Sequence, residues 1–265
     1  MSATGSPPAR AGTAWYVYGV VPTGTPPAPL EGAPALGGGP VRIVGEGALG
    51  AVVSEVPLAD FDDEPLAANL HDPVWLEAGV RRHDAVLAAL VRAGAVVPFR
   101  FGTIYRSEAQ VRAMLAEHPG LADALEAVRG RIELGVKGFA RDPAAHEASD
   151  AEGAASPGRR YLEQKQQARR AAEEREALLA RAADESHARL GAVADEARVN
   201  PLQPRDASGG EGEMFLNGAY LVATAREQAF RQTVDALGTE LGSPGLLAFE
   251  LTGPWPPYNF VEVER

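Results

Sequence analysis

The N-terminal part of the chain alternates between polar stretches and short apolar runs. Residues 1–13 are rich in Ser, Pro, Ala and Gly and predict a disordered tail. Residues 14–21 are dense in aromatic and β-branched side chains and stop at Pro22, which predicts a buried strand. Two further apolar runs, at 41–44 and 50–56, are separated by a glycine-rich turn and predict a hairpin.

Helical spacing of apolar positions begins after the hairpin. Asp72 followed by Pro73 predicts the N-cap and the first position of a helix, and Gly94 predicts its end. An extended segment is expected at 95–105, and Ser107 is expected to cap a further helix. The apolar stripe of the first helix comprises Leu76, Val80, Leu87, Leu90 and Val91.

The second half predicts a β-α-β-β-α-β order. This order is that of a ferredoxin-like fold, in which two helices cover one face of an antiparallel sheet. The predicted fold class is therefore α+β, with two domains, antiparallel sheets, ferredoxin-like (βαββαβ) character and a long charged helix. The six elements are expected at residues 131–139, 159–198, 197–203, 214–223, 226–241 and 246–251.

The expected domain organisation follows from these patterns. Residues 1–13 form the tail, residues 14–130 an N-terminal α+β domain, and residues 131–265 a C-terminal ferredoxin-like domain that ends in a Pro/aromatic tail. A low-complexity linker is expected at 141–158, directly before the helix at 159–198.

Composition narrows the classes of function. The chain has 265 residues and a net charge of −11, which disfavours nucleic acid and anionic membranes as partners. It has no cysteine, so disulfides and thiolate metal sites are excluded. No signal peptide is recognisable, and no apolar run reaches the ~20 residues that span a bilayer. We therefore expect a cytoplasmic protein.

Candidate catalytic motifs are weak. The run Gly45–Gly50 matches G-x-G-x-x-G, but it leads into β-type sequence and provides no helix N-terminus for a phosphate. A hairpin turn is the better interpretation, with a nucleotide site as the minor alternative. The histidines are interpreted as surface or helix-packing residues, and for His83, between Arg82 and Asp84, an ion pair on the helix surface is preferred. No cofactor, metal site or catalytic residue is predicted, and we expect no enzymatic activity.

The long helix at 159–198 carries nine basic and eight acidic residues around a thin apolar stripe. As one helix it would be ~60 Å long, which exceeds a compact domain of this size. It is either a solvated helix packed on the sheet, or a helix or helical hairpin that projects toward a partner or a second copy.

The C-terminal run Gly253–Phe260 is rich in proline and in aromatic residues. Consecutive prolines favour an extended backbone, and Trp255, Tyr258 and Phe260 provide large apolar groups. These side chains either pack on the core or form a binding surface for an apolar partner.

Four stretches together resemble the GvpF/GvpL family of gas vesicle proteins. The resemblance spans about residues 14–263, and His83-Asp84 also fits it. The stretches are Tyr16-Val17-Tyr18-Gly19-Val20, Val97-Pro98-Phe99-Arg100-Phe101-Gly102-Thr103, Leu216-Asn217-Gly218-Ala219-Tyr220-Leu221-Val222 and Leu251 to Val261.

The resemblance implies a non-enzymatic accessory protein of gas vesicle assembly, located in the cytoplasm in association with the vesicle. It implies that the chain binds the hydrophobic shell protein GvpA or nucleates the shell, with other accessory proteins as further partners. The alternative is a minor structural component built into the shell. The residues expected to bind the partner are Phe99, Arg100, Phe101, Pro254, Trp255, Pro257, Tyr258 and Phe260.

Overall fold

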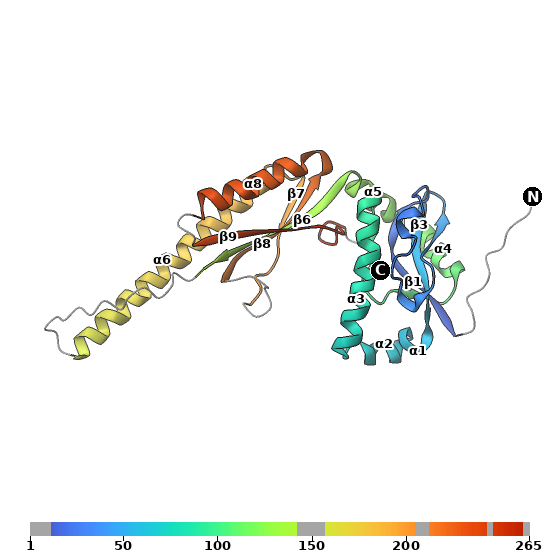
Figure 1. Ribbon diagram of the computed structural model, residues 1–265, viewed down its shortest axis with the longest axis horizontal. Helices are drawn as coiled ribbons and strands as arrows, with labels where there is room; N and C mark the ends of the chain where they lie inside the picture. The colour runs from blue at the N-terminus through green and yellow to red at the C-terminus, as the bar shows by residue number, and fades with distance from the viewer. Residues whose placement is uncertain (1–11, 142–156, 205–211, 243–245, 262–265) are drawn as a thin grey trace, which may run out of the picture. The chain divides into compact units, whose positions relative to one another are not determined.

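The chain forms two compact units (Figure 1). The first unit comprises residues 1–133 together with 254–265, and the second comprises residues 134–253. The sequence placed the C-terminal residues with the second domain, whereas the packing and hydrogen bonds of residues 254–261 group this segment with the first unit.

The computed structural model describes most of the chain. The expected disordered tail, apart from its last two residues, and the expected linker, apart from its ends, lie outside the described residues. The described ranges are 12–141, 157–204, 212–242 and 246–261.

The first unit is built on one antiparallel sheet with strand order β2-β3-β1-β4, in which β5 also pairs with β1. The run Gly45–Gly50 contains the turn, at Gly47 and Ala48, that joins β2 to β3 in the predicted hairpin. The strands are β1 (Thr13–Pro22), β2 (Arg42–Glu46), β3 (Leu49–Pro57), β4 (Val97–Pro98) and β5 (Ile104–Tyr105).

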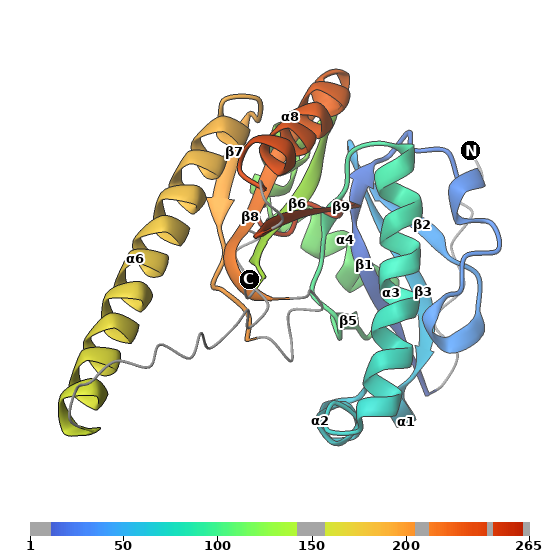
Figure 2. The ribbon, with the colours of Figure 1, turned by 60° about the vertical axis from the view of Figure 1, so that its left-hand side comes forward.

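Helices cover both faces of this sheet, with α3 in front of the strands and α4 behind them in Figure 2. Helices α4 and α5 pack on one face through apolar side chains such as Val111 and Leu125. Helix α3 packs on the other face through Val86, Leu87 and Leu90. The helices are α1 (Leu58–Phe61), α2 (Asp63–Asn69), α3 (Pro73–Ala93), α4 (Glu108–Glu117) and α5 (Gly120–Val128).

Strand β1 lies at the centre of this unit and is buried on both faces. Trp15 and Val17 point into the cluster with α4 and α5, whereas Tyr16 and Tyr18 point into the cluster with α3. A register shift against β3 follows Val17, so that Val20 faces the same side as Val17 despite the odd spacing. This two-sided burial explains why the run reads as continuously apolar in the sequence.

The second unit has the predicted β-α-β-β-α-β order. Its four-stranded sheet has the order β7-β8-β6-β9, which in chain order is 2-3-1-4, the ferredoxin-like arrangement. The predicted α+β class is therefore confirmed. The elements are β6 (Arg131–Ala140), α6 (Pro157–Gly191), β7 (Glu196–Val199), β8 (Glu213–Ala223), α8 (Glu227–Glu240) and β9 (Leu247–Trp255).

Helix α6 is one continuous helix rather than a hairpin, and it ends earlier than predicted. It spans 35 residues and stops at Gly191, although helical composition continues to 198. The backbone N–H of Asp195 donates to Leu221 O, and residues 196–199 pair with β8. Strand pairing therefore determines the structure of these last residues, in spite of their helix propensity.

The described helices can be compared with the expectation that no segment spans a bilayer. None of these helices combines the length and apolar character that crossing a bilayer requires.

The segment expected to be extended over 95–105 is instead two short strands separated by a turn, in which Gly102 has a φ of 90°. This turn positions the site described next.

Candidate interaction site at the C-terminal segment

The turn between β4 and β5 carries three of the residues predicted to bind a partner. Phe99 is buried, Arg100 is exposed, and Phe101 is half-buried. The ring of Phe101 lies against α3 at Gly79, where an added Cβ would be 2.7 Å from Phe101 Cζ. A larger residue at position 79 would therefore force the Phe101 ring to move away from α3.

Aromatic rings surround His83, which lies on the buried face of α3 and is only 2% exposed. The imidazole stacks on Tyr18 with ring centroids 5.6 Å apart. It meets Tyr16 and Phe101 edge-on at 5.7 and 5.9 Å. These rings come from β1 and from the β4–β5 turn, so His83 joins three separate parts of the first unit.

Both ring nitrogens of His83 bond to tyrosine hydroxyls. The distance from Nδ1 to the Tyr16 hydroxyl is 2.8 Å, and that from Nε2 to the Tyr258 hydroxyl is 2.9 Å. The Tyr258 hydroxyl also donates to Phe99 O at 3.0 Å, and the Tyr16 hydroxyl accepts from Gly102 N at 3.1 Å. The β4–β5 turn thus bonds to both ends of this row of three side chains.

One arrangement of protons satisfies all four of these bonds. Because Tyr258 donates to Phe99 O, its oxygen accepts from His83 Nε2–H, and Nδ1 then accepts from Tyr16 O–H. The imidazole is neutral in this arrangement. Burial lowers the pKa of His83 to about 4, an effect that the Phe99 carbonyl partly offsets. Burial also raises the pKa of Tyr16 and of Tyr258, so both hydroxyls keep their protons.

The C-terminal segment, residues 254–261, is held to the first unit by more than Tyr258. Asn259 donates from its backbone N–H and from Nδ2 to the carboxylate of Glu133, at 3.1 and 2.6 Å. Glu133 is itself buried, so these charge-assisted bonds compensate for removing its carboxylate from water. Pro257 and Phe260 are also buried.

The remaining predicted residues lie at the surface. Pro254 and Trp255 end β9 and are exposed, and Trp255 retains 48% of its accessible area. Tyr258 is 41% exposed, although its hydroxyl points inward to His83. Arg100 directly follows Phe99, whose carbonyl binds Tyr258. The structure thus divides the predicted set into buried anchors and exposed side chains.

Three residues of this site were not identified from the sequence. His83 is buried, so the interpretation as an ion pair on the helix surface is wrong and that as a helix-packing residue is confirmed. Its position was available in the pattern, because residue 83 lies three after Val80 and four before Leu87 on the apolar stripe of α3. Glu133 and Asn259 gave no such signal, since they lie 126 positions apart.

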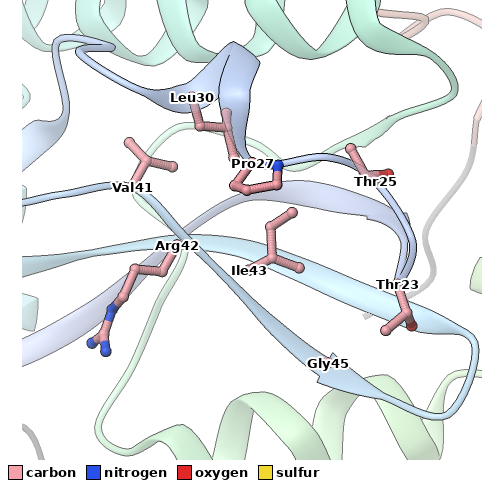
Figure 3. A pocket seen from close by; sticks show the side chains of 8 residues that line it. All are labelled: Thr23, Thr25, Pro27, Leu30, Val41, Arg42, Ile43 and Gly45. Carbon is pink, nitrogen blue, oxygen red and sulfur yellow. The ribbon is translucent and has the colours of Figure 1, made fainter.

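The glycine-rich turn at Gly45–Gly50 lies beside a shallow cavity of about 370 Å³ (Figure 3). Arg42, the only cation in its lining, lies over the ring of Trp15 at 4.4 Å and pairs with Glu55. No α-helix N-terminus contributes to this lining. The cavity therefore lacks the anion-binding features of a nucleotide site. Its lining consists of Thr23, Thr25, Pro27, Leu30, Val41, Arg42, Ile43 and Gly45.

Comparison with known proteins identifies the family. A family model described as gas vesicle synthesis protein GvpL/GvpF matches residues 14–262. The chain belongs to the GvpL/GvpF family. Gas vesicle protein L of Streptomyces sp. (strain CB03234) is 39% identical over 238 residues, which cover 88% of this chain and 87% of that protein. Gas vesicle protein F of the same strain is 31% identical over 264 residues, which cover 93% and 99%.

Solved structures of GvpF share the fold. The crystal structure of GvpF from Anabaena sp. PCC7120 superposes with a TM-score of 0.68 at 18% identity and covers 96% of this chain and 98% of that one. GvpF from Microcystis aeruginosa gives a TM-score of 0.63 at 20% identity. The chain therefore has the GvpF fold. Its role related to gas vesicles follows from the family model and the Streptomyces relatives.

Three of the four stretches that resemble the GvpL/GvpF family meet at His83. Tyr16 comes from the first stretch, Phe99 and Gly102 from the second, and Tyr258 from the last. The fourth stretch lies in β8, inside the sheet of the second unit. Three of the stretches on which the resemblance rests thus provide hydrogen bonds that hold the C-terminal segment in place.

Proposed function

We propose that this chain is a non-enzymatic accessory protein of gas vesicle assembly that binds the hydrophobic shell protein GvpA. The observation that carries the proposal is the C-terminal segment, which is fixed by buried anchors while Trp255 and the ring of Tyr258 remain exposed. A rigid aromatic surface binds an apolar partner with little loss of side-chain entropy.

The surroundings of His83 support a role without catalysis. Of the four histidines that the structure describes, His83 alone is buried, and tyrosine hydroxyls occupy both of its ring nitrogens. A general base needs an accessible nitrogen near a substrate. Here the imidazole instead holds a segment of chain against the protein.

A co-expression pull-down with GvpA tests the proposed surface. We expect the wild-type chain to capture GvpA and Trp255→Ala to capture at least tenfold less. Val74→Ala is the matched control, because Val74 is an exposed apolar residue of the same unit, at the start of α3. Capture by Trp255→Ala equal to that by wild type would remove Trp255 from the binding surface.

Two further results separate binding from assembly. Failure of the wild-type chain to capture GvpA would contradict the proposed partner. Retention of the chain on washed, intact vesicles at a fixed ratio to GvpA would instead favour the alternative, a minor structural component. Point variants are preferable to deletion of residues 253–265, because deletion also removes Phe260 and the Asn259–Glu133 bonds that hold the first unit together.

A further inference from the structure

The first half of α6 is a helix surface without packing in the described part of its own unit. Residues 164–174 are all exposed, and the first buried side chain along the described part of the helix is Leu179. Figures 1 and 2 both show this end of α6 running beyond the strands of the second unit. A helix of this kind is either stable in solvent by its own propensity or covered by another molecule.

A groove of about 550 Å³ lies farther along the same helix, between α6 and α8. Leu178 is 54% exposed at this groove, whereas the adjacent Leu179 is buried. Three carboxylates also line the groove, and Arg189 pairs with two of them, Glu185 and Glu240. The full lining is Glu174, Ala177, Leu178, Arg181, Ala182, Glu185, Glu240, Leu241 and Leu247.

Charge along α6 is divided between the exposed segment and the groove. Residues 164–172 contain three basic residues and no acidic ones, a net charge of +3. Residues 173–185 contain two basic and five acidic residues, a net charge of 2 − 5 = −3. The two segments are therefore complementary to each other, and they cannot meet within a single straight helix.

The two segments also share one face of the helix. Residues three or four apart lie on the same side, so the row through Glu174 and Leu178 continues back to Arg170 and Gln167. The row is apolar and acidic at the groove, and neutral or basic in the exposed segment. A second α6 that runs antiparallel would place each kind of surface on the other, whereas a parallel one would place like charges together.

We infer that two copies of this chain pair through α6, antiparallel, with residues 164–172 of each copy laid along the groove between α6 and α8 of the other. A two-fold axis near residue 172 places Arg170 of one copy beside Glu174 of its partner, and the same contact forms twice. The exposed Leu178 is then covered by the partner helix near Gln167. The inference does not depend on the proposed binding of GvpA.

Charge reversal tests the pairing in sedimentation velocity experiments. We expect concentration-dependent dimers of the full chain, and at least a tenfold rise in the dimer dissociation constant for Arg170→Glu and for Glu174→Arg. Exchange of both charges in one chain, R170E with E174R, should restore dimers. A mixture of the two single variants should form heterodimers, because one variant is then acidic at both positions and the other is basic at both.

Lys165→Glu is the matched control. It makes the same charge change on the same exposed part of α6, but at roughly 100° per residue it lies on the opposite side from Glu174. We expect its dimer dissociation constant to stay within about twofold of wild type. A monomeric wild-type chain at every concentration, or equal weakening by Lys165→Glu and Arg170→Glu, would overturn the inference. Failure of the charge exchange to restore dimers would overturn it as well.

Discussion

Helices α3 and α6 are the two longest helices that the structure describes, and they are stabilised in different ways. Helix α3 has 21 residues, begins at an N-cap and buries one face along most of its length. Helix α6 has 35 residues, and the described part of its first half is exposed. Helix α3 packs on the sheet through its buried face, whereas the first half of α6 runs beyond the strands of its own unit.

The difference shows that α3 is stabilised by tertiary packing, whereas the exposed half of α6 is stabilised by helix propensity. The exposed half of α6 consists of Gln, Lys, Arg, Ala and Glu, all favourable in helices, and Arg169 pairs with Glu173 one turn away at 2.8 Å. Helix α3 instead carries Val, Leu and His on its buried face. One helix thus contributes to the core, and the other presents surface.

Truncation of one leucine in each helix should give the largest contrast. Leu87 of α3 is fully buried, so Leu87→Ala should lower the free energy of unfolding of the first unit by about 2–5 kcal/mol. Leu178→Ala on α6 should change stability by less than about 0.5 kcal/mol. All three tryptophans, at 15, 75 and 255, lie in or next to the first unit, so their fluorescence during urea unfolding reports on it.

For Leu178→Ala the measurement is helical circular dichroism during the same titration. A loss of several kcal/mol from this substitution would contradict the exposure of Leu178. A loss below about 1 kcal/mol in Leu87→Ala would contradict the burial of α3.

The His83 site should make the stability of the first unit depend on pH. The folded-state pKa of about 4 lies below the value of about 6.5 expected in an unfolded chain, so between these values the unfolded state binds the additional proton. The stabilising contribution is therefore complete above about pH 6.5 and is lost as the pH falls toward 4. One group with this shift accounts for about 3 kcal/mol.

His83→Gln isolates this contribution, because glutamine can donate to Tyr258 and accept from Tyr16 but does not titrate. We expect tryptophan-detected unfolding of the variant to depend less steeply on pH between 6.5 and 4 than that of wild type. Parallel stability curves for the two proteins over this range would show that His83 is not held neutral.

The N-cap of α3 should give the smallest of these effects. The carboxylate of Asp72 accepts from the backbone N–H groups of Val74 and Trp75, so Asp72→Ala should cost about 1 kcal/mol. Asp72→Asn retains an acceptor and should recover most of this loss. Equal destabilisation by both substitutions in the urea titration would exclude the capping bond as the cause.

Local patterns in the sequence predicted most of the fold. The N-cap at Asp72, the β2–β3 hairpin and the order of elements in the second unit all depend on neighbouring residues, and the structure confirms them. The end of α6 was predicted too late because residues 192–198 favour a helix locally, whereas β8 provides strand partners that only the fold reveals.

The candidate site was predicted in part, for the same reason. Phe99 and Tyr258 were both among the residues expected from the sequence to bind a partner. In the structure they are in contact, although they lie 159 positions apart. The sequence could not show which aromatic side chains would be buried, because Phe260 and Trp255 look alike in a Pro/aromatic run. Nor could it show that His83 lies beside them, since a histidine on an apolar stripe is compatible with several environments.

The return of the C-terminal segment to the first unit has a consequence for biosynthesis. Residues 134–253 leave the ribosome before Tyr258 and Asn259 do, yet these two side chains complete the bonds to His83 and Glu133. The second unit can therefore fold while the first still lacks its last segment. During synthesis, the bonds of Tyr258 to His83 and of Asn259 to Glu133 are therefore among the last of the described contacts of the first unit to become available.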